Sequence, residues 1–246
     1  MNLIEFGFVV LFFGLIIFFT VTGRKTVKRN LREIPAFTRL IRGVGLAVEA
    51  GQRLHLALGH GGISNQQGAS TLVGLSMLQR IARAASISDR PPVATSGEAT
   101  QAILSQDTLH QTYHAMGADE QYDPDSGQLS GFTPFSYAAG TLPVIYDQQA
   151  SVNVLIGTFG NEVALITDAS ERKGSLTLGC SDNLPAQAIL YAAAQEPLIG
   201  EELYAGGAYL QAGPAHLASL RAQDILRWVL IVVILLLAAL KLVGVQ

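Results

Sequence analysis

The stretch Arg53–Gly62, RLHLALGHGG, joins a short alternating run to a glycine-rich loop. Leu54, Leu56 and Leu58 recur at every second position, which is typical of a β-strand because successive side chains of a strand point to opposite faces. The glycines suit a tight turn into the helix that we predict from about Ala69 to Ser86. A strand, a glycine loop and a helix in this order are the opening of a βα unit, which belongs to a parallel sheet.

The alternation of strand and helix continues along the chain. Further strands are predicted at Val93–Thr95, Val152–Phe159, Ser175–Cys180 and Pro197–Ile199. Helical patterns fill the intervening segments, and another helix follows Pro35 and leads into the domain. Since no paired hairpin turns separate the strands, we expect an α/β fold with a Rossmann-like, mainly parallel sheet of four to five strands and helices on both faces.

Two segments fit this scheme less clearly. Gly117–Gly131 is acidic and rich in turn residues, and we interpret it as a surface loop. Asp123 and Asp125 faintly resemble a calcium-binding loop, but the glycine spacing is wrong and the bidentate Glu is missing. Phe132–Gln149 fits a helix weakened by Gly140 and Pro143, or a strand in its second half.

Apolar runs lie at both ends of the chain. Ile4–Val21 is 18 residues long with Glu5 as its only charge, and about 27 Å of helix nearly matches the hydrocarbon thickness of a bilayer. Trp228–Val243 is a second such run, interrupted only by Lys241. A cleaved signal peptide is the alternative for the first run, but it lacks a basic start and a small-x-small cleavage site. Both runs are therefore predicted to be transmembrane helices.

Basic residues gather on the domain side of these two runs. They are Arg24, Lys25, Lys28, Arg29, Arg32, Arg221 and Arg227. The positive-inside bias then predicts an inner-membrane protein with two spans, a cytoplasmic domain and both termini outside. The expected division is a transmembrane helix at 1–23, a basic juxtamembrane segment at 24–35, the α/β domain at 36–213, and a juxtamembrane and second transmembrane helix at 214–246.

Composition argues against two classes of main partner. Between Glu33 and Leu220 there are eight Lys or Arg against seventeen Asp or Glu. This acidic balance argues against nucleic acid or anionic lipid as a main partner, because binding of phosphates needs clustered basic residues. Cys180 is the single cysteine, which excludes an intramolecular disulfide and a CxxC metal site.

A ligand site is expected where the strands end, because ligands of open α/β sheets bind beyond the carboxyl ends of the strands. The candidate ligand-binding residues are Gly59, His60, Gly61, Gly62, Ser96, Thr158, Ser181 and Asp182. The GHGG loop could present backbone N–H groups to an anion, or it could be only a tight turn. It matches neither the P-loop nor the GxGxxG pattern.

No catalytic, cofactor or metal site is predicted. The chain has no GxSxG motif, and Cys180 is interpreted as a buried or edge cysteine rather than a nucleophile. His110 and His114 have the spacing of two metal ligands on a helix, but no third ligand is evident. His55 is interpreted as a packed or hydrogen-bonded strand histidine.

The order of these features resembles an uncharacterised prokaryotic membrane-protein family known only as a domain of unknown function. The resemblance rests on the stretches AVEAGQRLHLALGHGGI, VLIGTFGNE and PLIGEELYAGGAYL between the two apolar runs. It covers most of the chain and supports the architecture, and it implies no activity, cofactor or site residue.

Two classes of function remain. The first is a non-catalytic scaffold, a membrane-anchored domain that forms homo-oligomers or docks other membrane proteins. The second is a membrane-tethered sensor or enzyme that binds a nucleotide or another anion at the strand ends. A transport pore has less support, because neither apolar run carries a charge at its centre.

Overall fold

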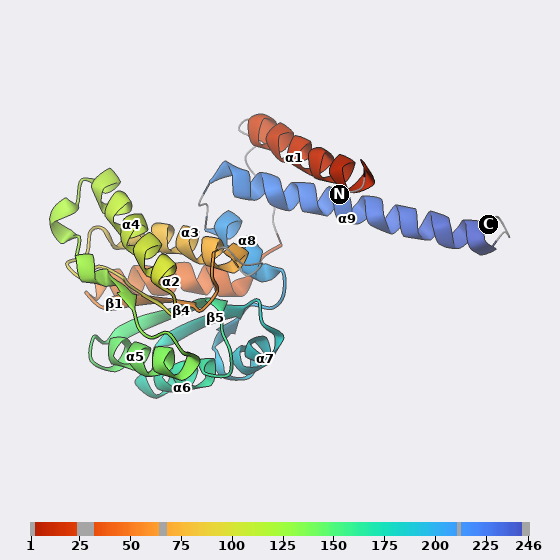
Figure 1. Ribbon diagram of the computed structural model, residues 1–246. Helices are drawn as coiled ribbons and strands as arrows, with labels where there is room; N and C mark the ends of the chain where they lie inside the picture. Colours follow the sequence, from red (N-terminus) through yellow and green to blue (C-terminus); the bar gives the residue numbers. More distant parts are fainter. Residues whose placement is uncertain (1–2, 24–31, 64–67, 211–212, 243–246) are drawn as a thin grey trace. The chain divides into compact units, whose positions relative to one another are not determined.

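The computed structural model describes residues 3–23, 32–63, 68–210 and 213–242. Contacts along the chain divide it into two compact units (Figure 1). Residues 33–212 form one unit, the α/β domain. Residues 1–32 and 213–246 form the other, which holds the helices α1 (Leu3–Gly23) and α9 (Pro214–Leu242).

The α/β domain alternates strands and helices throughout. Its elements are α2 (Pro35–Glu49), β1 (Arg53–Gly59), α3 (Gly68–Ala85), β2 (Val93–Ser96), α4 (Ala99–Met116), the 3-10 turns η1 (Asp119–Gln121) and η2 (Pro124–Ser126), β3 (Gly127–Leu129), α5 (Pro134–Tyr146), β4 (Ala150–Thr158), α6 (Val163–Lys173), β5 (Leu176–Ser181), α7 (Leu184–Ala193), β6 (Glu196–Pro197) and α8 (Glu202–Tyr209). The sheet has the order β3-β2-β1-β4-β5-β6, and all neighbouring strands are parallel. The predicted parallel α/β class is confirmed.

The sheet has six strands instead of the expected four to five. The additional strand β3 lies in the acidic segment 117–131, which we predicted to be a loop. It pairs only with β2, where Thr95 lies opposite Gln128. A strand of three residues is too short for a side-chain alternation to be recognised, so its position is decided by pairing with β2.

The ambiguous segment 132–149 contains a helix, α5. Thr133 forms a capping box in which its hydroxyl accepts from the N–H of Ser136 and the Ser136 hydroxyl accepts from the N–H of Thr133. Pro134 occupies the first turn, where the absence of a backbone N–H carries no penalty. These N-terminal signals outweigh the effect of Pro143 inside the helix.

Two apolar cores cover the two faces of the sheet. Leu54, Leu56 and Leu58 of β1 pack in one core with α2, α3, α4 and α8. Ala57 of the same strand belongs to the other core, with α5, α6 and α7, and Figure 1 shows the same two helical layers. The alternation along β1 thus divides its side chains between the two cores.

In the second unit α1 packs against α9. The buried residues of α9 are Ala218, Ala222 and Leu226, spaced by four as on one face of a helix. Of the described helices only Ala215–Leu242 is long and apolar enough to cross a membrane, whereas the apolar part of α1, Phe6–Thr22, is shorter. The predicted basic segment Arg24–Arg29 lies outside the described residues.

Candidate functional site

The sheet brings the eight predicted ligand-binding residues to one edge. Gly59 ends β1 and is followed by His60, Gly61 and Gly62, while Ser96, Thr158 and Ser181 end β2, β4 and β5, and Asp182 follows β5. The strand order reverses between β1 and β4, because the chain runs outward from β1 to β3 and then returns to β4. Such a switch point is where open parallel sheets bind ligands. We call this region the carboxyl-edge site.

The GHGG loop uses its first backbone N–H groups internally. The N–H of Gly59 donates to the Tyr137 hydroxyl over 3.3 Å, and the N–H of His60 donates to the Thr158 carbonyl over 2.8 Å. Gly59 has a φ of 69°, a left-handed conformation that favours glycine. The first two N–H groups of the loop are therefore engaged, and the structure favours a tight turn over an anion cradle.

Gly61 lies at the centre of the site and is tightly enclosed. Its carbonyl accepts hydrogen bonds from the Thr71 hydroxyl, at 2.9 Å, and from the Gln101 side-chain amide. A Cβ atom at position 61 would lie 2.5 Å from the Thr158 hydroxyl oxygen. Glycine is required here because the β4 end approaches the loop so closely.

Asp182 links three elements of the edge. Its Oδ2 accepts hydrogen bonds from the hydroxyls of Ser70 in the first turn of α3 and Thr158 at the end of β4, each at 2.9 Å. A carboxylate at a helix N-terminus complements the positive end of the helix dipole. A phosphate bound at the N-terminus of α3 would therefore lie next to the negative charge of Asp182.

His60 lies on the other side of the loop, against the end of β2. Its ring contacts Tyr137 edge-on with centroids 4.8 Å apart, and its Nδ1 is 3.6 Å from Oε1 of Glu162. Glu162 is buried, and the same Oε1 accepts the N–H of Gly160 over 2.8 Å. Gly97 packs against the His60 ring so closely that a Cβ there would clash with it.

A buried chain of hydrogen bonds anchors the loop to the core. Tyr137, which accepts from Gly59, lies 3.2 Å from the Thr95 hydroxyl, and this hydroxyl lies 2.9 Å from Nε2 of His55. Nδ1 of His55 lies 2.9 Å from the side-chain amide oxygen Oδ1 of Asn153, which can only accept, so this nitrogen carries the proton. Burial lowers the pKa of His55 to about 4 and raises that of Tyr137 to about 12. The prediction of a hydrogen-bonded strand histidine is confirmed.

Ser96 and Ser181 have structural partners. The Ser96 hydroxyl donates to the Gln128 carbonyl of β3, and the Ser181 hydroxyl accepts from the N–H groups of Phe159 and Asn183. By contrast, Nε2 of His60 and Oδ1 of Asp182 are buried without a hydrogen-bond partner among the described residues. His60 and Asp182 are therefore the predicted residues with the best chemistry for a ligand.

Sequence reasoning missed Glu162 and Gln101. Both lie close in sequence to predicted strand ends, but a carboxylate and an amide in these positions are equally typical of a solvated helix start. Their burial, 2% and 0% exposed respectively, distinguishes them. This burial depends on α5 and α3, which are distant in sequence.

The other titratable candidates have structural surroundings. Cys180 is buried, and this burial raises the pKa of its thiol to about 12, so it is a poor nucleophile. His114 lies 3.0 Å from an Asp119 carboxylate oxygen on an exposed turn. Within the described ranges, no cluster of three His, Cys, Asp or Glu residues is arranged to hold a metal ion.

The whole chain, residues 1–246, matches the model of the domain of unknown function DUF6754. The chain belongs to this family. No curated protein and no solved structure matches it. Membership confirms the resemblance to a domain of unknown function, and because the family description names no activity, function is argued from the site itself.

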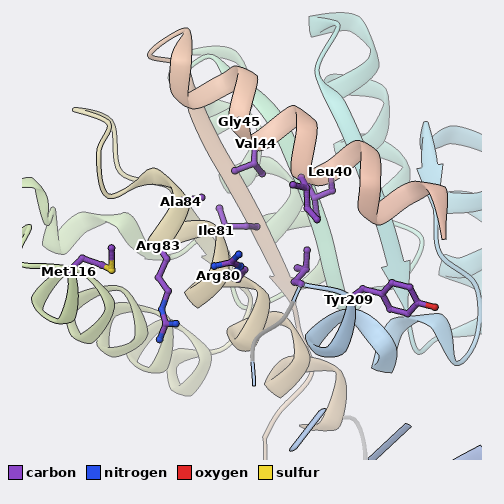
Figure 2. Close-up of a pocket in the computed structure, with 11 residues that line it drawn as sticks. Leu40, Val44, Gly45, Arg80, Ile81, Arg83, Ala84, Met116 and Tyr209 are labelled. Atoms are coloured by element: carbon purple, nitrogen blue, oxygen red, sulfur yellow. The ribbon is translucent and has the colours of Figure 1, made fainter. Parts of the chain in front are cut away.

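A second feature of the DUF6754 chain is an apolar groove between α2, α3, α4 and α8, with a cavity volume of about 710 Å³. Figure 2 shows Leu40 and Val44 of α2 across from Ile81 of α3 and Tyr209 of α8. The exposed side chains of Arg80 and Arg83 line the same groove. Sequence reasoning missed this groove because its lining comes from four separate helices.

Proposed function

We propose that this protein is a membrane-anchored α/β module that self-assembles, with a second copy docking at the apolar groove. The observation that carries the proposal is the composition of the groove, which combines an apolar lining with Arg80 and Arg83. Ile41 and Met116 in its lining are 55% and 50% exposed. Exposed apolar surface with a charged rim is typical of protein interaction sites.

Charge complementarity favours a second copy as the occupant. The acidic segment Asp119–Asp125 begins three residues after Met116, which itself lines the groove. The apolar groove, which carries Arg80 and Arg83, is thus followed closely in the chain by an acidic segment. A surface that combines the two is self-complementary across a two-fold axis, where the groove of each copy meets the acidic segment of the other.

The membrane part of the proposal rests on α9, the helix long enough to span a bilayer. We propose that α1 accompanies it as a second span and that the domain is cytoplasmic, because the basic residues follow α1 and precede the apolar part of α9. Tethering at both ends confines the copies to one plane and favours lateral contacts. Lipid and further membrane proteins are then the other proposed partners.

Charge reversal on the full chain in mild detergent tests the assembly. Arg80→Glu with Arg83→Glu should convert dimers into monomers in native mass spectrometry, and so should Glu120→Lys with Asp125→Lys. The four changes together should restore dimers, because the charges are exchanged. Lys173→Glu at the exposed end of α6 is the matched control and should leave the dimers intact. Wild-type protein that is only monomeric, or reversals without effect, would refute the proposal.

Cysteine labelling on intact cells tests the orientation. The natural Cys180 is buried, so the background reaction should be low. Cysteines introduced at Asn2 and Gln246 should react with an impermeant maleimide, and one at Asp125 should react only after lysis. The opposite pattern would place the domain outside.

A second candidate function is a membrane-tethered small-molecule sensor or enzyme at the carboxyl-edge site. It is favoured by the two unpartnered atoms, Nε2 of His60 and Oδ1 of Asp182, at the switch point of the sheet. The anion-binding form of this function has less support, because loop N–H groups are engaged and carboxylates flank the loop. A thermal-shift screen in which no metabolite raises the melting temperature would count against a sensor or enzyme here.

A further inference from the structure

We infer that the carboxyl-edge site binds an organic cation that donates several hydrogen bonds, such as an amine or a guanidinium compound. This inference rests on the second candidate function. It concerns the chemistry of the ligand and reverses the expectation of an anion drawn from the GHGG loop.

The charges of the site favour a cation. Glu98, Glu162 and Asp182 bring three carboxylates to the edge, and Glu162 is only 2% exposed. By contrast, Arg53 begins β1 and Arg90 precedes β2, so both lie toward the opposite edge of the sheet. A region of the protein that carries one sign of charge raises the local concentration of ligands of the other sign.

Unpartnered acceptors gather around Gly61. Gln101 is fully buried and its amide nitrogen donates to the Gly61 carbonyl, while its Oε1 has no partner among the described residues. Oδ1 of Asp182 is also unpartnered, and Asp182 is bonded to Thr158, which contacts Gly61. A buried acceptor without a donor is unfavourable, so a ligand that supplies N–H donors would stabilise both atoms.

Within the described ranges, buried polar atoms without hydrogen-bond partners also lie on the β2 side of the GHGG loop. Nε2 of His60 and Oε2 of Glu98 are buried and lack partners in the part of the chain that the structure describes. Glu98 follows Gly97, which packs against the His60 ring. Unpartnered atoms therefore lie on both sides of the GHGG loop.

The spacing of these groups distinguishes an organic cation from a metal ion. The described residues hold no set of three acidic, His or Cys side chains close enough for one metal ion. Acceptors that are spread around a loop instead suit an extended molecule with several separate donors. A phosphate is disfavoured, because Asp182 already accepts from Ser70 at the start of α3.

Calorimetry and thermal shift on the full chain in detergent micelles test this inference. Spermidine and agmatine are the probes, with choline, which has no N–H donor, and Mg²⁺ at matched ionic strength as controls. We expect binding of spermidine or agmatine, and about tenfold weaker binding of choline, since loss of charge-assisted hydrogen bonds has this order of effect. Mg²⁺ should give no comparable shift.

Variants locate the binding. Asp182→Asn removes the charge but keeps an oxygen that can accept from Ser70 and Thr158, and it should weaken spermidine binding about tenfold. Glu98→Gln should have a similar effect and serves if the first variant does not fold. Glu171→Gln, near the exposed end of α6, is the matched control and should bind as the wild type does.

The outcomes distinguish a failure of the inferred organic cation from a failure of the second candidate function. Equal binding of choline and spermidine, or undiminished binding to both edge variants, overturns the hydrogen-bonding cation. Binding of AMP or phosphate without binding of amines also overturns it, but leaves a small-molecule site at this edge. Failure of amines, nucleotides and phosphorylated metabolites alike overturns the second candidate function as well.

Discussion

Protonation of His55 should destabilise the domain in a predictable pH window. His55 is fully buried, and burial lowers its pKa from the ordinary 6.5 to about 4. His55 is therefore protonated near pH 6.5 in the unfolded chain but only near pH 4 in the folded chain. The contribution of His55 to stability is intact above pH 6.5, falls as the pH drops from 6.5 to 4, and is constant below 4.

The size of the effect follows from the shift in pKa. One pKa unit corresponds to about 1.4 kcal/mol, so the full loss below pH 4 is about 3 kcal/mol and the loss at pH 5 is about 2 kcal/mol. For a domain of this size, about 2–4 °C of melting temperature corresponds to each kcal/mol. Acidification from pH 7 to 5 should therefore lower the melting temperature by roughly 4–8 °C through this one residue.

A comparison with His55→Gln isolates this contribution. Glutamine does not titrate, and it keeps an amide donor and acceptor for Asn153 and Thr95. Thermal unfolding of both full-length proteins in the same detergent, followed by circular dichroism at several pH values, gives two slopes. All other titrating groups are common to the two proteins, so their contributions cancel in the difference between the two slopes. Parallel slopes between pH 7 and 5 would refute the assignment of His55 as a buried neutral histidine.

Three further predictions concern packing and reactivity. Gly61→Ala should destabilise the domain by about 1–3 kcal/mol, because the new methyl group would overlap the Thr158 hydroxyl; Gly45→Ala on α2, which has open space around it, should be neutral or stabilising by up to about 1 kcal/mol, and urea unfolding distinguishes the two. Ala222→Leu should disrupt the packing against α9, because Ala222 is 0% exposed, and the loss of stability should appear as a lower melting temperature in detergent; an unchanged value would contradict the burial of Ala222. The Cys180 thiol, with its pKa raised to about 12 by burial, should not react with a maleimide at pH 7.5 until the protein is unfolded, and rapid labelling of the folded protein would contradict its burial.

Much of the fold was readable from local patterns. The alternation Leu54, Leu56, Leu58 predicted β1, and the run from Val152 predicted β4, because a strand that alternates or is rich in β-branched residues shows its period within a few positions. The order of strands and helices then implied a parallel sheet and placed the GHGG loop at its carboxyl edge. The long apolar helix α9 was equally evident, because hydropathy is a property of consecutive residues.

Other features depend on contacts between distant parts of the chain. The pairing of β3 with β2 and the position of β1 beside β4 follow from the packing of whole layers, and no single segment encodes them. The unpartnered atoms of Gln101 and Asp182 are chemically important only because α3, β4 and the GHGG loop enclose them. The groove likewise exists only where α2, α3, α4 and α8 meet. Local periodicity reports which face of an element is buried, whereas a binding site depends on what buries it, and that is decided when the layers pack.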